Sequence, residues 1–108
     1  MESDKFFETY NKFERKWAEF LSRKFSYRNT SALGMTALRI CYYVVKNPNC
    51  ALKEIALSLD ISLGSASQMV QAMTIGGLLS SIQNKDDRRR IAIAPAETLI
   101  QFFNELTI

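Results

Sequence analysis

Apolar residues recur along most of this chain at the spacing of α-helices. In residues 4–25 they follow one another at steps of three and four, and a charged side lies opposite, so a long amphipathic helix is predicted there. A second helix is expected over residues 32–46, with Thr30 or Ser31 as its N-cap. The first apolar stripe is almost wholly aromatic and consists of Phe6, Tyr10, Phe13, Trp17, Phe20, Leu21 and Phe25; the second is expected to include Met35, Leu38, Tyr42 and Val45.

Two shorter apolar faces follow in the middle of the chain. Each has the i, i+3, i+4 and i+7 spacing of one helix face. Residues 60–62 between them leave room only for a turn, and Gly76-Gly77 is expected to end the second helix. The first face is Leu52, Ile55, Ala56 and Leu59, and the second is Ala66, Met69, Val70 and Met73.

The pattern then changes to that of a hairpin. Residues 78–83 and 90–94 are predicted strands, joined by residues 84–89, and Cys50-Ala51 is expected to pair with them as a very short strand. Pro95 is expected to break the second strand before a last helix over residues 96–106, with Leu99, Ile100, Phe103 and Leu106 as its apolar face. Helix, turn, helix and hairpin form the layout of a winged helix-turn-helix. We therefore expect a mainly α fold with a small antiparallel sheet.

Length and charge narrow the class of protein. The 108 residues suit one domain, 1–108, with an N-terminal helical segment (1–28) and a winged core (50–95). No apolar run approaches the ~20 residues that cross a bilayer, and the acidic N-terminus lacks a signal region, so no membrane association and a cytoplasmic location are expected. The net charge of +3 is compatible with a polyanionic partner. Its distribution is uneven, because residues 61–84 carry no charge and residues 85–90 carry four positive and two negative charges.

The residues that usually carry catalysis or hold metals are scarce. The chain has no histidine and two cysteines, Cys41 and Cys50, which is too few ligands for a structural zinc site. We interpret both cysteines as free thiols, with Cys41 in a helix core. No glycine-rich phosphate loop or nucleophile–base pair is present, so neither an enzyme nor a cofactor is predicted.

The second helix of a helix-turn-helix enters the major groove, so exposed residues near its start are candidate DNA contacts. Ser62 is placed to cap this helix, Gly64 would allow a close approach of the backbone, and Gln68 could pair with adenine N6 and N7. The alternative is an ordinary neutral, solvated helix face. The candidates are Ser62, Leu63, Gly64, Ser65, Ser67, Gln68 and Gln71.

The hairpin tip supplies the positive charge that this helix lacks. Arginine fits phosphate geometry and enters narrow minor grooves, and Asp86 or Asp87 could orient one arginine. The alternative is a charged tip that keeps the hairpin soluble and protects its edge. The candidate wing contacts are Lys85, Arg88, Arg89 and Arg90.

These segments resemble the MarR-type winged helix-turn-helix regulators. Residues 55–62 are similar to the start of the family's helix-turn-helix, and residues 65–73 continue it without a gap. Gly77-Leu78-Leu79 resembles the exit into the wing, and Asp87-Arg88-Arg89, before the strand with Ile91 and Ile93, resembles the acidic-arginine wing motif. The wing pattern fits both Asp86 with Arg88 and Asp87 with Arg89. We favour the second pair, because Arg89, Ile91 and Ile93 then alternate on one strand face.

The resemblance implies a transcription regulator that binds pseudopalindromic DNA, usually as a homodimer built through its terminal helices, and that often responds to a small aromatic effector or an oxidant. It assigns Ser62, Ser65, Ser67 and Gln68 to the major groove and Arg88 or Arg89 to the minor groove. Three features depart from the family pattern. The recognition helix (62–75) has no lysine or arginine, with Leu63 and Gln68 at often basic positions; Pro95-Ala96 follows the wing; and the chain ends at Ile108, before the usual C-terminal dimerisation helices.

Partners other than DNA are also predicted. The aromatic N-terminal helix is long for one small domain to cover, so we expect a homodimer through Phe6, Phe7, Tyr10, Phe13 and Trp17, although a stripe of this kind is more often internal core. A cleft between the first two helices, near Met35, Arg39, Tyr42 and Tyr43, could hold an aromatic effector; packing of these side chains in the core is the commoner explanation. The alternative function is a winged-helix protein–protein interaction module without specific DNA binding.

Overall fold

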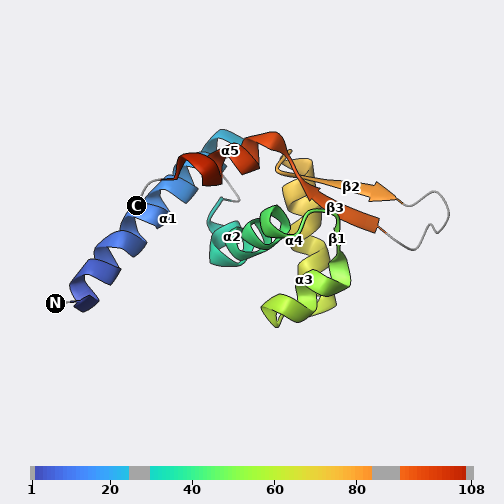
Figure 1. Ribbon diagram of the computed structural model, residues 1–108, viewed down its shortest axis with the longest axis horizontal. Helices are drawn as coiled ribbons and strands as arrows, with labels where there is room; N and C mark the ends of the chain where they lie inside the picture. The colour runs from blue at the N-terminus through green and yellow to red at the C-terminus, as the bar shows by residue number, and fades with distance from the viewer. Residues whose placement is uncertain (1, 25–29, 84–90, 107–108) are drawn as a thin grey trace.

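The computed structural model describes residues 2–24, 30–83 and 91–106. They form five helices and three short strands (Figure 1), which confirms the expected mainly α fold with a small antiparallel sheet. The order along the chain is α1 (Glu2–Lys24), α2 (Thr30–Lys46), β1 (Cys50–Ala51), α3 (Leu52–Leu59), α4 (Leu63–Ile75), β2 (Leu79–Gln83), β3 (Ile91–Pro95) and α5 (Glu97–Glu105).

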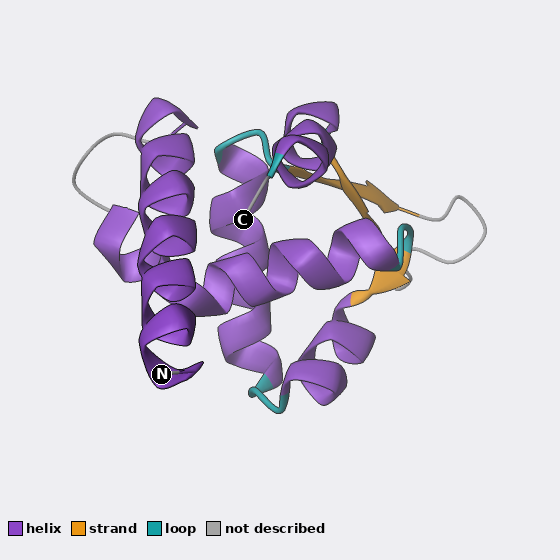
Figure 2. Cartoon of the chain, turned by 60° about the vertical axis from the view of Figure 1, so that its left-hand side comes forward, coloured by secondary structure: helices purple, strands orange, loops and turns teal. Residues whose placement is uncertain are grey.

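Helix α2 is the centre of the fold. It contacts α1 and α5 on one side, α3 and α4 on the other, and strand β3. Figures 1 and 2 show α1 along one side of the molecule and the β2–β3 hairpin at the opposite side. The helix-turn-helix is therefore held at a distance from α1 by the intervening α2.

The central position of α2 explains where its predicted inward face was wrong. Leu38 is buried and Val45 is partly buried, as expected, but Met35 and Tyr42 are exposed. A helix packed on both sides buries more than one narrow stripe. The buried face of α2 consists of Ala37, Leu38, Ile40, Cys41 and Val44.

Near its start, α2 is interrupted at Gly34. The backbone there has φ 26° and ψ −148°, a conformation that glycine adopts readily because it has no Cβ. The indole Nε1 of Trp17 donates a hydrogen bond to the carbonyl oxygen of Gly34 at 3.2 Å. The break in α2 thus contributes to holding α1. Side chains at 30–33 are outside the described part of the chain, so the N-cap predicted at Thr30 or Ser31 stays a prediction.

The aromatic stripe of α1 divides into two halves. In the C-terminal half, Trp17, Phe20 and Leu21 are buried, and the Phe102 ring of α5 lies 5.5 Å from Trp17 and 4.6 Å from Phe20 between centroids. The N-terminal half projects from the body (Figure 1). The prediction that Ile100 faces inward was wrong: Leu99 is buried, Phe102 and Phe103 are partly buried, and Ile100 is exposed. The Phe102 ring faces inward, where it packs against the rings of Trp17 and Phe20.

The sheet has the strand order β1-β3-β2, and both pairs are antiparallel. Cys50 of β1 pairs with Ile93 of β3, so the predicted pairing of residues 50–51 with the wing is confirmed. Strand β3 ends at Pro95, as predicted, but Pro95 is itself the last residue of the strand and lies opposite Leu79. A proline is tolerated there because its missing N–H falls at the strand end.

Candidate nucleic-acid interface

The turn between α3 and α4 sets the angle of the helix-turn-helix. Asp60 ends α3 in the left-handed region (φ 55°), which aspartate tolerates better than most residues. The N–H of Ile61 bonds to the carbonyl oxygen of Ala56 at 3.0 Å. Arg39 of α2 then donates to the carbonyl oxygen of Leu59 at 3.2 Å. The end of α3 is therefore fixed to α2, and α4 starts from a defined position.

One face of α4 anchors it to the core. Ala66, Val70 and Met73 are buried, as the spacing predicted, and Met69 is partly buried. The Sγ of Cys41 in α2 donates to the Sδ of Met73 at 3.7 Å. The backbone N–H of Leu78 bonds to the carbonyl oxygen of Met73 at 2.9 Å, which ties the helix end to the start of the hairpin.

The opposite face of α4 is open. All seven candidate contacts from Ser62 to Gln71 are exposed. At 100° per residue, Gly64, Gln68, Gln71 and Ile75 form the centre of this face, Ser67 lies beside it, and Leu63 lies at its edge in the first turn, about 110° from the centre. We call these six residues the α4 outer face. No hydrogen bond joins either glutamine amide to another described residue, so both amides are available to a ligand.

Two of the predicted contact residues have a structural role. Ser62 is the N-cap of α4: its Oγ accepts a hydrogen bond from the Ser65 N–H at 3.0 Å and donates to the Ser65 Oγ at 2.9 Å. This is the usual use of serine at a helix start. Both side chains remain exposed, but their hydroxyls are occupied by the cap. The side chains best placed to meet a base are therefore on the α4 outer face.

A shallow groove of about 270 Å³ separates α4 from the sheet. Ser67, Gln71 and Ile75 line it from α4, and Ser81 and Ile91 line it from β2 and β3. Two exposed isoleucine side chains at this groove were not predicted: Ile75 is 79% exposed and Ile91 is 45% exposed. Ile82, 56% exposed, lies on the other face of the sheet. The step of four from Gln71 to Ile75 was the signal that places Ile75 on the outer face.

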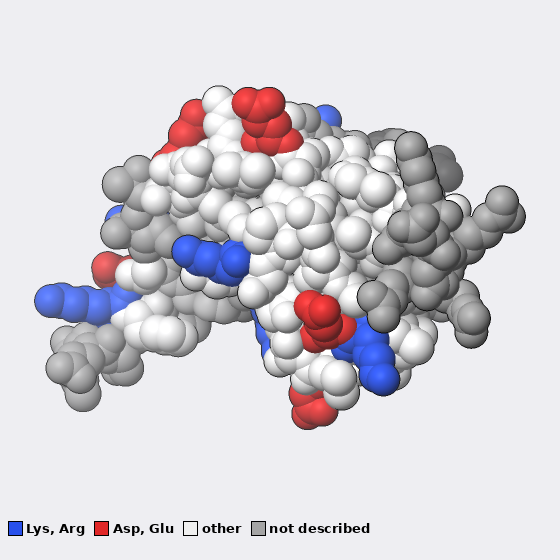
Figure 3. All heavy atoms as spheres, turned by 45° about the vertical axis from the view of Figure 1, so that its right-hand side comes forward, with Lys and Arg blue, Asp and Glu red and all other residues white. Residues whose placement is uncertain are grey.

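The charged wing tip lies beyond the described residues. Lys85, Asp86, Asp87, Arg88, Arg89 and Arg90 all fall in 84–90, so their roles stay predictions. Strands β2 and β3 point toward this segment from beside α4 (Figure 1). Among the described residues seen in Figure 3, uncharged ones predominate, and a few separate Lys, Arg, Asp and Glu side chains lie between them.

The predicted dimer residues differ in exposure. Phe6 is 71% exposed, Phe7 63% and Tyr10 38%, whereas Phe13 is partly buried. Trp17 is 2% exposed and lies in the chain's own core, so its side chain is not open to a partner. The interface prediction is therefore narrowed to the N-terminal half of α1.

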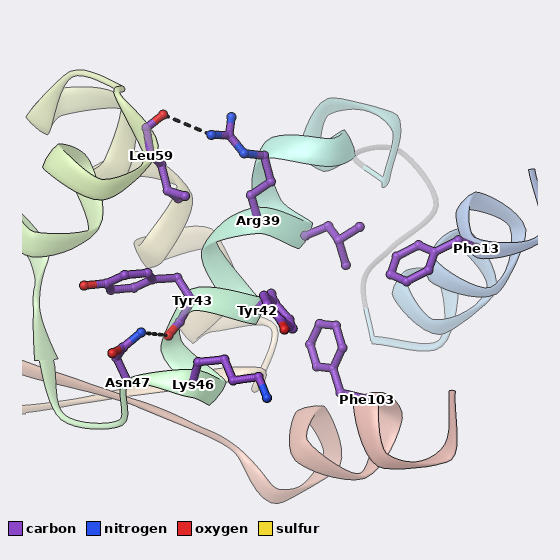
Figure 4. A pocket seen from close by; sticks show the side chains of 9 residues that line it. Phe13, Arg39, Tyr42, Tyr43, Lys46, Asn47, Leu59 and Phe103 are labelled. Atoms are coloured by element: carbon purple, nitrogen blue, oxygen red, sulfur yellow. Dashed lines mark hydrogen bonds between the residues drawn. The ribbon is translucent and has the colours of Figure 1, made fainter. Parts of the chain in front are cut away.

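A second cavity, of about 520 Å³, lies between α1, α2, α3 and α5. Figure 4 shows the rings of Phe13, Tyr42 and Phe103 gathered at one side of it. Tyr42 and Phe103 are 5.6 Å apart, edge to face, and the Nζ of Lys46 lies 5.6 Å from the Tyr42 ring centre. Arg39 and Tyr43 line the cavity as predicted, and Met35 is not among its lining residues. The lining carries two cations and no carboxylate.

Both cysteines are buried free thiols. Burial raises the pKa of Cys41 to about 12. Burial also raises the pKa of Cys50, and the Glu54 carboxylate adds to this effect. A thiol with a raised pKa contains little thiolate near neutral pH and reacts slowly. Among the described residues, no group of three His, Cys, Asp or Glu side chains is placed to hold a metal ion, and no helix is long and apolar enough to cross a bilayer.

Several solved structures have this arrangement. No protein-family model and no curated protein sequence matches the chain. A MepR–DNA complex from S. aureus superimposes with a TM-score of 0.68 at 14% identity, over 92% of this chain and 76% of that one. The fold is the MarR-type winged helix. A MarR regulator from Methanosarcina mazei Go1 matches with a TM-score of 0.64 at 11% identity, over 95% of this chain and 69% of that one.

The zinc-responsive MarR family member ZitR from Lactococcus lactis matches with a TM-score of 0.58 at 20% identity, over 65% of this chain and 48% of that chain. This chain spans between 47% and 66% of the length of the first solved structures it matches. At such low identity the likeness establishes the MarR-type fold, and the side chains at the site have to be judged on their own chemistry.

Proposed function

We propose that this protein is a DNA-binding transcriptional regulator of the MarR type. Helix α4 lies in the major groove, and residues 84–90 contact the minor groove or the backbone. The observation that carries the proposal is the α4 outer face: it is fully open, its two glutamine amides are unengaged, and it lies beside a two-stranded wing. The MepR structure with the same fold was solved on DNA, which supports the same use here.

The size of helix α4 and the small side chains at its start suit a DNA major groove. A groove about 12 Å wide admits an α-helix, and small side chains such as Gly64 and Ser67 let the helix axis come close to the base edges. The first N–H groups of a helix favour a phosphate. Because residues 61–84 have no charge, the recognition helix adds no side-chain charge, and the basic residues 85–90 supply electrostatic attraction beside it.

A salt titration tests the proposal. Binding of the protein to fluorescent genomic and random duplexes is followed by anisotropy as salt is raised. We expect the dissociation constant to rise at least about tenfold between roughly 50 and 200 mM salt, because phosphate contacts release counterions. Replacing Arg88 and Arg89 with alanine should flatten the slope by about one to two units in log–log form. An unchanged slope would reject the wing assignment.

The same substitution, glutamine to glutamate, can be made on the α4 outer face and on α5, and the DNA affinities of the two variants can be compared. Gln68→Glu puts a carboxylate where the groove presents acceptors and phosphates, and should weaken binding roughly tenfold or more. Gln101→Glu makes the same substitution on exposed α5, which lies away from the start of α4 (Figure 1), and should leave the affinity within about twofold. Equal losses in the two variants would mean that α4 is not the contact surface.

The protein is further proposed to act as a homodimer through the N-terminal half of α1. Phe6 and Tyr10 stack with ring centres 6.5 Å apart, and together with Phe7 they form an exposed apolar patch on a projecting helix. Two-fold symmetry would match a pseudopalindromic site. Light scattering should give twice the 12.3 kDa chain mass, and Phe7→Glu should halve it. A monomer at micromolar concentration would contradict this part of the proposal.

The cavity beside α2 is the proposed effector site. Four aromatic side chains and two cations without a carboxylate favour an aromatic anion. The Arg39 guanidinium is already engaged with Leu59, so Lys46 is the cation best placed to meet the anion. Calorimetry with benzoate, and with benzyl alcohol as the neutral match, should show binding of benzoate only, reduced in Lys46→Gln. Equal binding of the two probes would contradict a role for charge.

One observation favours the alternative, a protein–protein interaction module. The outer surface near the groove is uncharged and contains the exposed side chains of Ile75 and Ile91, and Ile82 is exposed on the opposite face of the sheet. Clustered exposed apolar side chains often mark protein contacts. The salt titration separates the two functions, because a protein-binding surface predicts no salt-dependent affinity for any duplex. A location in the cytoplasm follows from either proposal.

A further inference from the structure

The chemistry of the α4 outer face also indicates which bases it would select. We propose that this face selects A·T base pairs, with Gln68 and Gln71 each taking an adenine and Leu63 contacting a thymine methyl group. The inference rests on the proposed function and adds to it the base composition of the site. It uses only side chains that the structure describes.

The glutamine amides match adenine. In the major groove adenine presents the N7 acceptor beside the N6 donor, and one amide, which has both an acceptor and a donor, can satisfy the two together. Both amides are exposed and join no other described residue in a hydrogen bond. Gln68 and Gln71 are separated by about 4.5 Å along the helix axis, close to the ~3.4 Å rise of one base pair. They are therefore spaced to meet neighbouring base pairs.

Guanine has no arginine or lysine partner on this helix. It presents two adjacent acceptors, O6 and N7, which arginine or lysine satisfies best. Residues 61–84 contain neither residue type, and α4 has no charged residue at all. At the helix start the Ser62 hydroxyl both accepts and donates within the cap, and the Ser65 hydroxyl oxygen accepts the bond from Ser62.

An apolar side chain at the edge of this face matches thymine. Leu63, the first residue of α4, is 55% exposed, although a leucine side chain at a surface position gains nothing from water. Thymine is the base that offers a methyl group in the major groove. Ile75, about 18 Å further along the helix axis, is a second exposed apolar side chain of α4.

Selection from a pool of random duplexes tests the inference with the full chain. We expect A·T-rich half-sites, and replacement of a selected A·T pair by G·C should weaken binding roughly 5- to 150-fold. Replacing thymine by uracil, which lacks the methyl group, should weaken binding to the wild type but not to Leu63→Ala. Replacing adenine by 7-deazaadenine, which lacks the N7 acceptor, should weaken binding to the wild type but not to Gln68→Ala at the position that Gln68 contacts.

A charge-matched pair of variants separates base selection from simple attraction. Gln68→Arg should change the preference at one position from A·T to G·C, whereas Gln101→Arg adds the same charge on α5 and should leave the preference unchanged. Tight, salt-dependent binding with G·C-rich half-sites, or with no sequence preference, would overturn the inference and leave the proposed DNA-binding function standing. Absence of binding to every duplex would overturn both.

Discussion

The anchoring of α4 through Met73 gives a quantitative test of the fold that presents the site. Met73 is fully buried, its Sδ accepts a hydrogen bond from the Cys41 Sγ, and its carbonyl oxygen holds the start of the hairpin. Met73→Ala removes the side chain and leaves a cavity between α2 and α4. Substitutions of this kind cost about 2–5 kcal/mol of unfolding free energy, out of a total of roughly 5–15 kcal/mol.

The assay is urea unfolding followed by the fluorescence of Trp17, the only tryptophan in the sequence. Trp17 belongs to α1 and is buried against Phe102 of α5, so its fluorescence emission reports loss of the core. Met69→Ala, one turn earlier on α4 and partly buried, is the matched control and should cost about 1 kcal/mol. Below the unfolding transition, Met73→Ala should keep its DNA affinity, because the α4 outer face is untouched.

Two results would refute this reasoning. A loss below about 1 kcal/mol in Met73→Ala would mean that the site collapses around the deletion and that α4 is not anchored there. A cost in Met69→Ala equal to that in Met73→Ala would mean that the buried face of α4 is rotated from the one described. In either case the assignment of the outer face would lose its basis.

The Ser62 hydroxyl and the two cysteine thiols give three further predictions. Ser62→Ala should lower the unfolding free energy by about 1 kcal/mol in urea denaturation, because it removes the N-cap of α4; Ser22→Ala on exposed α1 is the control. Because the folded pKa of Cys41 is raised from 9.0 to about 12, its stabilising contribution is complete below pH 9 and is lost as the pH rises toward 12. Wild type should therefore lose more stability than Cys41→Ala over that range, and equal losses would contradict the burial of this thiol. Both thiols should react with a disulfide reagent at neutral pH only as fast as the protein opens, and rapid reaction of the folded protein would contradict the described core.

The buried residues were predicted most accurately for helices that bury only one side. Helices α3 and α4 have single apolar stripes, and the residues expected to be inside, such as Ile55 and Val70, are buried. Helix α2 packs on both sides, so its stripe did not indicate which of its apolar residues, among them Tyr42, stay exposed. The stripe of α1 is continuous in sequence, but the chain's own elements cover only the half near Trp17.

The exposed residues of the candidate site were predicted in part, because α4 also has one clear apolar side. Polar residues on a helix with a clear apolar side must be outside, so the exposure of Gln68 and Gln71 followed from the pattern. Ile75 was missed because an apolar residue at a helix end is ordinarily assigned to the core. The occupation of the Ser65 hydroxyl by the cap required three-dimensional geometry, since sequence alone does not show to which group a serine is bonded.

The most direct test of the central claim is local cleavage of bound DNA. Because the natural cysteines are buried, a single exposed cysteine can carry an iron chelate that cuts nearby DNA. Ser67→Cys places it on the α4 outer face, and Ser22→Cys places the same group on α1. We predict strong cuts confined to a few base pairs of the major groove in each half-site from position 67 and none from position 22. Equal cleavage from both positions, or cleavage from position 22 alone, would contradict the placement of α4 in the groove.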